Sequence, residues 1–457
     1  IKRVNGKGEI MTFETKGKEN NGAIYGRRSD WQDLYSIAKK YYEALLADPG
    51  NAQFHLTDPR GASDKSGRTF NNPYQYFFEQ MHMDDAIYAD ESIYEYPMQQ
   101  GGGNDGRPYS FGRPSSGGSK AAYPCKSYGQ GRINPAYFYG VFDPNDMRRD
   151  VSITMTGSNG KGVEKLIPFV PNSKAEGGGL TLNKWDENRQ ANPWVAAQRK
   201  SGINGPYMRM SEVYLGYAEV CAALGDVVTG KQYLKTVRER SFPQGLANTD
   251  AFIASFGNDL VRAIIEERGF EYAGEGDRRW TLIRSGYLPE DIKRIKDMTK
   301  AMMDGLATKG YYEFENGNII SAYIWTKLVD AKTIYGHRLT AQCPTDKVND
   351  PVLYPGWRGQ KDNWEEMGLN YGSSTPATNL AIKGLFEIVS EEEAASLESQ
   401  GYAKVNWGID LVDYRDEYDK YLFWDYDYVS APIYLWPFTP NVMAAGGFTN
   451  GYGFKQE

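Results

Sequence analysis

Between residues 206 and 272, three successive segments carry apolar residues at helical spacing, with only short turns between them. The first is expected to begin with Pro206 in its first turn and to end at Gly225-Asp226. The second runs to about Arg240, and the third covers Asp259 to Tyr272. Helices joined by short turns are the unit of helical-repeat folds, in which each helix pair buries its apolar face against the next pair. The sequence therefore predicts a mostly α-helical chain.

The same signals predict further elements outside this stretch. A helix is expected from Trp31 to Leu45, because Ser29-Asp30 can cap its start and Asp48-Pro49-Gly50 stops it. Shorter helices are expected near residues 72–83, 291–302, 378 and 391–393, and a short strand at 92–96. Residues 140–205 are irregular in pattern. No segment is simple enough in composition to be a linker, so one domain with loop insertions is expected.

A long loop rich in Gly, Pro and Tyr is expected from Gln99 to Gln130. Seven aromatic residues lie in loop-like sequence where no periodicity buries them: Tyr109, Tyr123, Tyr128, Trp185, Trp194, Trp357 and Trp364. A sugar ring offers flat C–H faces to an aromatic side chain and hydroxyl groups to polar neighbours. These seven residues are the candidates for ligand contact, and the alternative for each is an ordinary place in the core.

Charge and cysteine content disfavour several classes of protein. The chain has 52 Lys and Arg against 59 Asp and Glu, a net charge of −7, which disfavours a nucleic-acid binder that neutralises phosphates. The cysteines, Cys125, Cys221 and Cys343, are too few and too far apart for a disulfide scaffold or a cysteine-rich zinc site. Cys221 is expected to be a small buried residue on a helix, and a pair between Cys125 and Cys343 stays open.

Two clusters of charged residues allow a functional and a structural interpretation. The first consists of Glu267, Arg268, Glu271, Glu275, Arg278, Arg279 and Arg284. Two of its carboxylates could be the acid and base of a glycosidase, but nearby arginines lower carboxylate pKa values, which favours structural ion pairs. The second cluster, Asp413, Asp416, Glu417, Asp419, Asp425 and Asp427, could hold a structural calcium ion or form a solvated face. No other cofactor is expected, because the glycine-rich stretches match neither a phosphate loop nor a dinucleotide motif.

The first cluster is part of a longer motif. Residues 267–286, which read ERGFEYAGEGDRRWTLIRSG, resemble the signature of the SusD/RagB family. Residues 142–149, 207–220, 233–240, 435–438 and 450–452 are similar to further stretches of that family, in the same order. The resemblance gives a structural role to Glu267, Arg268, Glu271, Glu275, Arg278 and Arg284.

The resemblance implies a SusD-like fold, with tetratricopeptide-like helix pairs, long loop insertions and a few short strands. It implies a surface-exposed lipoprotein of the outer membrane that captures glycans, or peptides in some members, for a SusC-like TonB-dependent transporter. Such proteins bind and do not catalyse. The lipid anchor of the family is at an N-terminal cysteine, and no residue near the start of this chain matches it, so an N-terminal part is expected to be missing.

The resulting expectation is a single SusD-like domain over residues 1–457. Within it, residues 29–96 form a helical repeat region, 97–205 a loop-rich region that faces the ligand, 206–286 a helical repeat region with the signature, and 287–457 a loop-rich C-terminal region. The alternatives that stay open are a secreted helical glycosidase or lyase and a peptide-binding, RagB-like member. The identity of the glycan stays open too.

Overall fold

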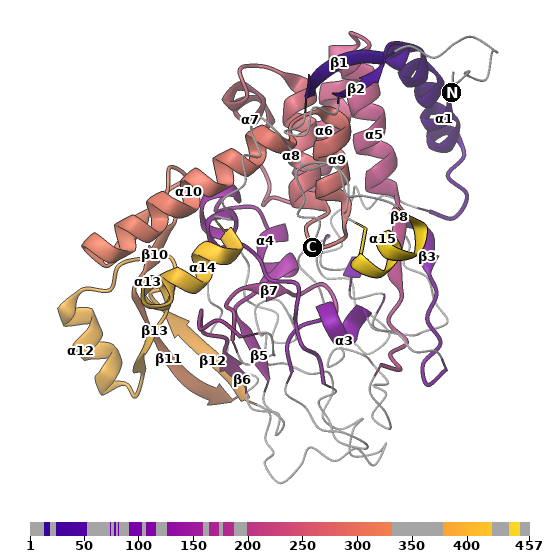
Figure 1. The fold of residues 1–457 in the computed structure, drawn as a ribbon. Helices are drawn as coiled ribbons and strands as arrows, with labels where there is room; N and C mark the ends of the chain where they lie inside the picture. The colour runs from indigo at the N-terminus through magenta and orange to yellow at the C-terminus, as the bar shows by residue number, and fades with distance from the viewer. Residues whose placement is uncertain are drawn as a thin grey trace.

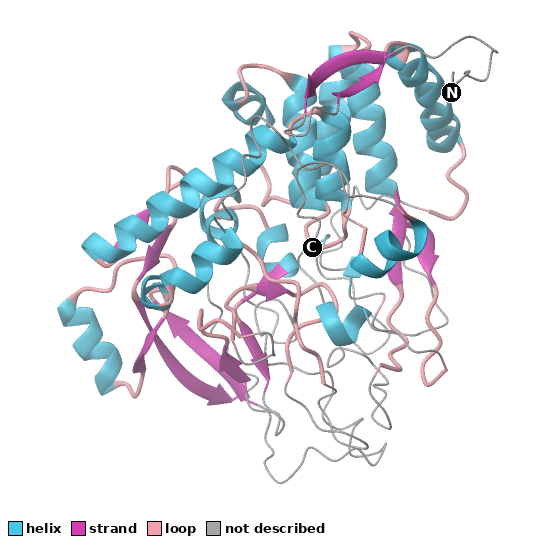
Figure 2. Cartoon of the chain, viewed as in Figure 1, coloured by secondary structure: helices cyan, strands magenta, loops and turns pink. Residues whose placement is uncertain are grey.

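A computed structural model describes residues 13–18, 24–52, 74, 77–78, 81, 91–102, 107–115, 126–158, 164–172, 177–186, 199–330, 378–422 and 438–447. Long helices gather on one side of the molecule, and short strands and loops make up the other side (Figures 1 and 2). The fold is mostly α-helical with few, short strands, as the sequence predicts. None of the helices in these ranges is both long and apolar enough to cross a membrane.

The helical side is built around a pair of antiparallel helices. Helix α5 (Met210–Ala223) turns at Gly225 into α6 (Val227–Arg240), and the left-handed backbone of Gly225 (φ +91°) favours glycine there. Asp226 then caps α6 by accepting a hydrogen bond from the backbone N–H of Thr229. Helices α1 (Trp31–Ala47) and α8 (Leu260–Glu271) pack on α5, as Figure 1 shows.

These helices share one apolar core. It contains Val213, Leu215 and Ala218 of α5, Leu234 and Val237 of α6, and Ala263 and Ile264 of α8, all fully buried. Cys221 of α5 is buried, as expected. Three further helices follow in the chain: α7 (Thr249–Ser255), α9 (Asp277–Ser285) and α10 (Leu288–Lys309).

The strands form small antiparallel sheets, most of them on the other side of the molecule (Figure 1). In the largest, β11 (Tyr323–Asp330) lies between β12 (Thr378–Lys383) and β13 (Ala403–Asn406). The two-stranded sheets are β1 (Phe13–Lys18) with β2 (Ile24–Arg28), β3 (Ser92–Tyr96) with β8 (Gly205–Arg209), β4 (Ile153–Thr154) with β7 (Thr181–Leu182), β5 (Thr156–Ser158) with β6 (Glu164–Leu166), and β9 (Tyr311–Glu313) with β10 (Ile319–Ser321).

Short helices complete the described chain. They are α3 (Arg107–Phe111), a π-helical turn η1 (Tyr137–Val141), α4 (Arg148–Ser152), α12 (Glu391–Ser399), α13 (Gly408–Asp413), α14 (Arg415–Leu422) and α15 (Pro440–Gly446). A second core lies between α10, α13 and the strands, and the Trp407 indole N–H there donates to the Tyr139 hydroxyl at 2.8 Å.

Several sequence predictions about elements were wrong. The segment near Thr378, which was expected to be a helix, is strand β12. Its Leu380, Ala381 and Ile382 are all buried, so the strand is apolar on both faces and lacks the alternating pattern that predicts a strand. Pro206 lies in β8, and the helix begins only at Met210. The Gln99–Gln130 loop contains α3, and the irregular stretch 140–205 contains α4 and short strands.

Other element predictions were confirmed. The helices expected at 31–45, 259–272 and 391–393 and the strand at 92–96 are present, and the helix expected at 291–302 is longer at both ends. Most of the helix expected at 72–83 lies outside the described residues, although Tyr74, Phe77 and Phe78 are helical.

A buried ion-pair network joins the helical side to the rest of the molecule. The carboxylate of Glu271, at the end of α8, pairs with Arg209 at 2.5 Å, with Arg148 at 3.1 Å, and with Arg240. All four side chains are buried. Burial alone would raise the pKa of Glu271, but the three arginines hold it well below its usual range.

The remaining signature residues extend this network. Glu267 pairs with Arg148 and Arg238, and Glu275 pairs with Arg209 and with Lys184 at 2.6 Å. The periodicity around Glu271 and Glu275, four residues apart, predicts that both lie on one helix face, but α8 ends at Glu271 and Glu275 lies in the turn that follows. The other signature arginines pair as follows: Arg268 with Glu212 and Asp277, Arg278 with Glu266 and Asp291, and Arg284 with Glu219.

Removing the central carboxylate charge should destabilise the fold. In a Glu271→Gln variant, three buried arginines lose their common partner, so we expect the free energy of unfolding to fall by about 3 to 5 kcal/mol. Urea denaturation measures this change. The matched control is Asp297→Asn on α10, which breaks the exposed pair with Lys293 and should cost under about 0.5 kcal/mol. Equal effects of the two variants would contradict the central role of Glu271.

The same carboxylate should make stability depend on pH. Its pKa is depressed in the folded state, so its contribution is fully present above the unfolded pKa of roughly 4.3 and is lost as pH falls below it. Between about pH 5 and pH 3 the parent protein should therefore lose more stability than Glu271→Gln does. Denaturation curves at several pH values check this, and parallel losses would contradict it.

Candidate functional site

Two of the predicted ligand-contact tyrosines lie against each other. Tyr109 is buried in α3, and its ring meets the half-buried ring of Tyr128 edge to face, with 5.1 Å between ring centres. The guanidinium of Arg199 lies 4.3 Å from the Tyr109 ring centre, and the ammonium of Lys126 lies 4.8 Å from that of Tyr128. Backbone hydrogen bonds, including Tyr128 N–H to Tyr109 C=O at 2.8 Å, hold the two segments together.

Trp185, a third predicted contact residue, lies close by but is buried. It belongs to an apolar cluster with Phe77, Phe78 and Ile203. Its carbonyl accepts a hydrogen bond from the Arg113 backbone N–H at 2.7 Å, which ties it to the residues after α3. The other predicted contact residues, Tyr123, Trp194, Trp357 and Trp364, lie outside the described residues.

A cavity of about 770 Å³, called the loop pocket here, begins directly after the Tyr128 segment. Three parts of the chain that are distant in sequence form it: residues 130–135, residues 169–172 with Gly178, and the start of α14. Its lining residues are Gln130, Arg132, Ile133, Asn134, Pro135, Phe169, Pro171, Asn172, Gly178, Tyr414, Glu417 and Tyr418. Apolar walls thus alternate with side chains that can donate or accept hydrogen bonds.

Hydrogen bonds hold the pocket walls in place. The Tyr418 hydroxyl donates to the Phe169 carbonyl at 2.5 Å, which joins α14 to the opposite wall. The Asn134 amide hydrogen-bonds to Thr299 of α10 at 3.0 Å. Burial lowers the pKa of Arg132 to about 10 and raises the pKa of Tyr418, so near pH 7 the first is a cation and the second is neutral.

This set of side chains suits a polyhydroxylated ligand. Amides, a guanidinium, a carboxylate and phenol hydroxyls can each bond to sugar hydroxyl groups. The Tyr414 ring is the open aromatic surface of the pocket, with 40% of the residue exposed. Sequence reasoning missed this pocket because its parts lie more than 280 residues apart, and it interpreted the Tyr414–Tyr418 stretch only as acidic.

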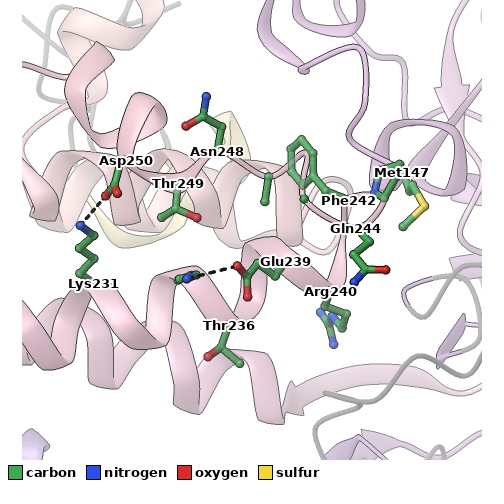
Figure 3. A pocket seen from close by; sticks show the side chains of 14 residues that line it. Met147, Lys231, Thr236, Glu239, Arg240, Phe242, Gln244, Asn248, Thr249 and Asp250 are labelled. Carbon is green, nitrogen blue, oxygen red and sulfur yellow. Dashed lines mark ion pairs between the residues drawn. The ribbon is translucent and has the colours of Figure 1, made fainter. Parts of the chain in front are cut away.

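A second cavity of about 810 Å³ lies between α6 and the loop that leads to α7, and is called the α6–α7 cavity. In Figure 3, Lys231 and Asp250 point toward each other at one end. A second ion pair joins Glu239 to Lys235 at 3.5 Å. The floor residues Phe242 and Met147 are buried. Its charged groups are already paired, Arg240 with carboxylates outside the cavity, and it offers no open aromatic ring, so it suits a sugar less well than the loop pocket does.

The functional alternatives for the two charged clusters, a glycosidase acid and base and a calcium site, do not form in the described part of the chain. Glu271 is fully buried among arginines and cannot meet a substrate as a glycosidase acid. No three Asp, Glu, His or Cys side chains there gather to hold a metal ion. Of the acidic cluster, Asp413, Asp416, Glu417 and Asp419 lie on α13 and α14, where Glu417 pairs with Lys420. Asp425 and Asp427 lie outside the described residues, as do Cys125 and Cys343.

Substitution at the aromatic candidates should separate core residues from surface residues. Trp185→Ala removes a buried ring and should lower the free energy of unfolding by about 3 to 5 kcal/mol. Tyr128→Ala should cost less, because its ring keeps solvent contact in the folded state. Urea denaturation of both variants compares them. A larger loss for Tyr128→Ala would contradict the described packing.

Comparison with known proteins identifies relatives of the chain. Residues 53–438 match the SusD family. SusD-like protein P25 of Formosa agariphila is 28% identical over 160 residues, which are 35% of this chain and 26% of that protein.

Solved structures resemble the chain more distantly. A SusD homologue from Bacteroides thetaiotaomicron has 18% identity and a TM-score of 0.40, over 63% of this chain and 57% of that one. Surface glycan-binding protein A from the same organism, solved with laminarihexaose, has 18% identity and a TM-score of 0.38, over 57% of this chain and 52% of that one. The chain thus spans little more than half the length of these structures. Because the family match covers most of the sequence, the chain belongs to the SusD family.

Proposed function

We propose that the protein binds oligosaccharides at the cell surface and delivers them to a SusC-like TonB-dependent transporter in the outer membrane. The observation that carries the glycan part is the loop pocket, which combines an open tyrosine ring with a ring of hydrogen-bonding side chains. Membership of the SusD family supports the same function.

The loop pocket offers both kinds of contact that a sugar needs. Its Tyr414 ring supplies a flat apolar face for the C–H groups of a pyranose. Gln130 and Asn172, both exposed at the pocket, and Arg132 between them supply donors and acceptors for the hydroxyl groups. Tyr128, two residues before Gln130, packs on the buried Tyr109 and adds a half-buried ring next to this part of the pocket wall in the chain.

The pocket chemistry supports binding without catalysis. Glycoside hydrolysis by the common mechanism needs two carboxylic groups on opposite sides of the scissile bond. Among the residues that line the loop pocket, Glu417 is the one carboxylate, and it pairs with Lys420 at 2.9 Å. We therefore propose a binding protein and not an enzyme.

The location and the transporter partner rest on family membership. A lipid anchor upstream of this chain would hold the protein on the outer membrane, with the transporter beside it. The loop aromatics outside the described residues, Tyr123, Trp194, Trp357 and Trp364, remain proposed contributors to ligand contact.

A binding array tests this proposal against its alternatives. The purified protein is screened against hexasaccharides of common plant and algal glycans, laminarihexaose among them, and against short peptides. We expect binding of at least one oligosaccharide with no release of reducing ends over hours. Turnover of the bound glycan would establish an enzyme, and binding of peptides alone would establish the peptide-binding alternative.

The pocket residues should control affinity without controlling stability. Tyr414→Ala should weaken binding of the hexasaccharide identified on the array by roughly tenfold, because a stacking face is lost, with little change in the melting temperature. Calorimetric titration measures the dissociation constant. The matched control is Tyr323→Ala, since Tyr323 is 37% exposed on β11 and lines neither cavity. Equal dissociation constants for Tyr414→Ala and the parent would contradict the loop pocket as the binding site.

A further inference from the structure

The two-stranded sheet β3–β8 exposes three tyrosines. Tyr94 and Tyr96 on β3 are 56% and 53% exposed, and Tyr207 on β8 is 79% exposed. The two strands are paired in antiparallel register and lie side by side in Figure 1. These three residues are called the tyrosine face. A contiguous group of exposed aromatic side chains, unlike a single one, is a feature of binding surfaces.

The inward side of β3 carries Ile93, which packs on the helical core, and also a charged residue that is buried. Glu95, between the two tyrosines, is only 2% exposed. Its carboxylate accepts a hydrogen bond from the Ser92 hydroxyl at 2.5 Å and from the Asn204 amide at 2.8 Å. A strand normally turns its apolar residues inward and its charged residues outward. Here buried hydrogen bonds fix the strand so that its aromatic residues face solvent.

The rings of the tyrosine face are arranged as a corner. The Tyr94 and Tyr207 rings meet at 88° with 5.6 Å between their centres, so a sugar lying on one ring is bordered by the other. The Arg107 guanidinium lies 5.5 Å from the Tyr96 ring centre. It occupies the space above Gly205, where an added Cβ would come within 1.2 Å of Arg107 Nη1. Gly205 thus leaves room for a hydrogen-bond donor beside the tyrosines.

Short helix α3 connects this face to the loop-pocket side of the molecule. Arg107, beside Tyr96, is the first residue of α3, and Tyr109 in the same helix packs on Tyr128. The Gln130 backbone N–H, at the pocket, donates to the Ser110 carbonyl at 2.6 Å. Both surfaces therefore offer open aromatic rings, phenol hydroxyls and a guanidinium, and helix α3 connects them.

We propose that the tyrosine face is a second glycan-contact surface, which binds a part of a long polysaccharide chain outside the loop pocket. This proposal rests on the proposed glycan-binding function. The face binds by stacking of sugar rings on Tyr94 and Tyr207, with hydrogen bonds from Arg107. A hexasaccharide held in the loop pocket does not need it, whereas a polymer contacts both surfaces and gains affinity from the second contact.

Affinity electrophoresis in gels that contain laminarin, amylopectin, xyloglucan or alginate tests the proposal. With the polysaccharide that retards the parent protein, Tyr94→Ala/Tyr207→Ala should weaken polymer binding roughly tenfold, since two stacking contacts are lost. Calorimetry with the hexasaccharide of the same polysaccharide should show a dissociation constant within about twofold of the parent. The conservative variant Tyr94→Phe/Tyr207→Phe keeps both rings and should retain most of the polymer affinity.

The control is Tyr41→Ala, because Tyr41 is 71% exposed on α1, away from the β3–β8 sheet. It should leave polymer binding unchanged. Unaltered retardation of Tyr94→Ala/Tyr207→Ala, with an unaltered melting temperature, would overturn the proposal. Retained polymer binding with loss of the complex with the transporter would overturn it too and mark the face as a protein interface. Failure of the parent to bind any polysaccharide or hexasaccharide would instead overturn the proposed function.

Discussion

The Glu271 carboxylate and its three arginines hold the parts of this molecule together. Each arginine comes from a different element: Arg148 begins α4, Arg209 ends β8 and Arg240 ends α6. Removing one partner from such a network leaves a buried charge uncompensated. This destabilises the fold far more than the loss of an exposed ion pair does. An arrangement of these elements that separated the four side chains would leave buried charges without partners.

The same network positions the candidate binding surfaces. Arg209 also pairs with Glu91, the residue just before β3, so both strands beneath the tyrosine face are anchored at the same point. Lys184 pairs with Glu275 and precedes Trp185, whose carbonyl holds the segment after α3. Burial lowers the pKa of Lys184 to about 8. The loops that carry the aromatic residues thus start from a rigid ionic centre, which suits a binding surface that has to be ready before its ligand arrives.

The sequence was sufficient for the helical side and insufficient for the site. Helices α5, α6 and α8 were predictable because their apolar spacing, caps and glycine turn all agree. Strand β12 was not predictable, because Leu380 to Ile382 are all buried and lack the alternation of apolar and polar residues that marks a strand. The loop pocket depends on contacts between residues near 130, 170 and 414, and no local pattern reports such contacts. The exposed tyrosines of the tyrosine face were not predicted. Their exposure depends on the hydrogen bonds that the buried Glu95 makes on the other face of β3.

The central claim is that glycans bind in the loop pocket, and hydrogen–deuterium exchange with and without a bound hexasaccharide tests it most directly. Ligand contact should slow exchange of backbone amides in the parts of the chain that form the pocket, residues 130–135, 169–172, 178 and 414–418, because the bound sugar restrains these walls. Amides around the α6–α7 cavity, residues 231–250, should exchange at the same rate in both samples. Protection confined to residues 231–250, with none in the three pocket stretches, would contradict the account.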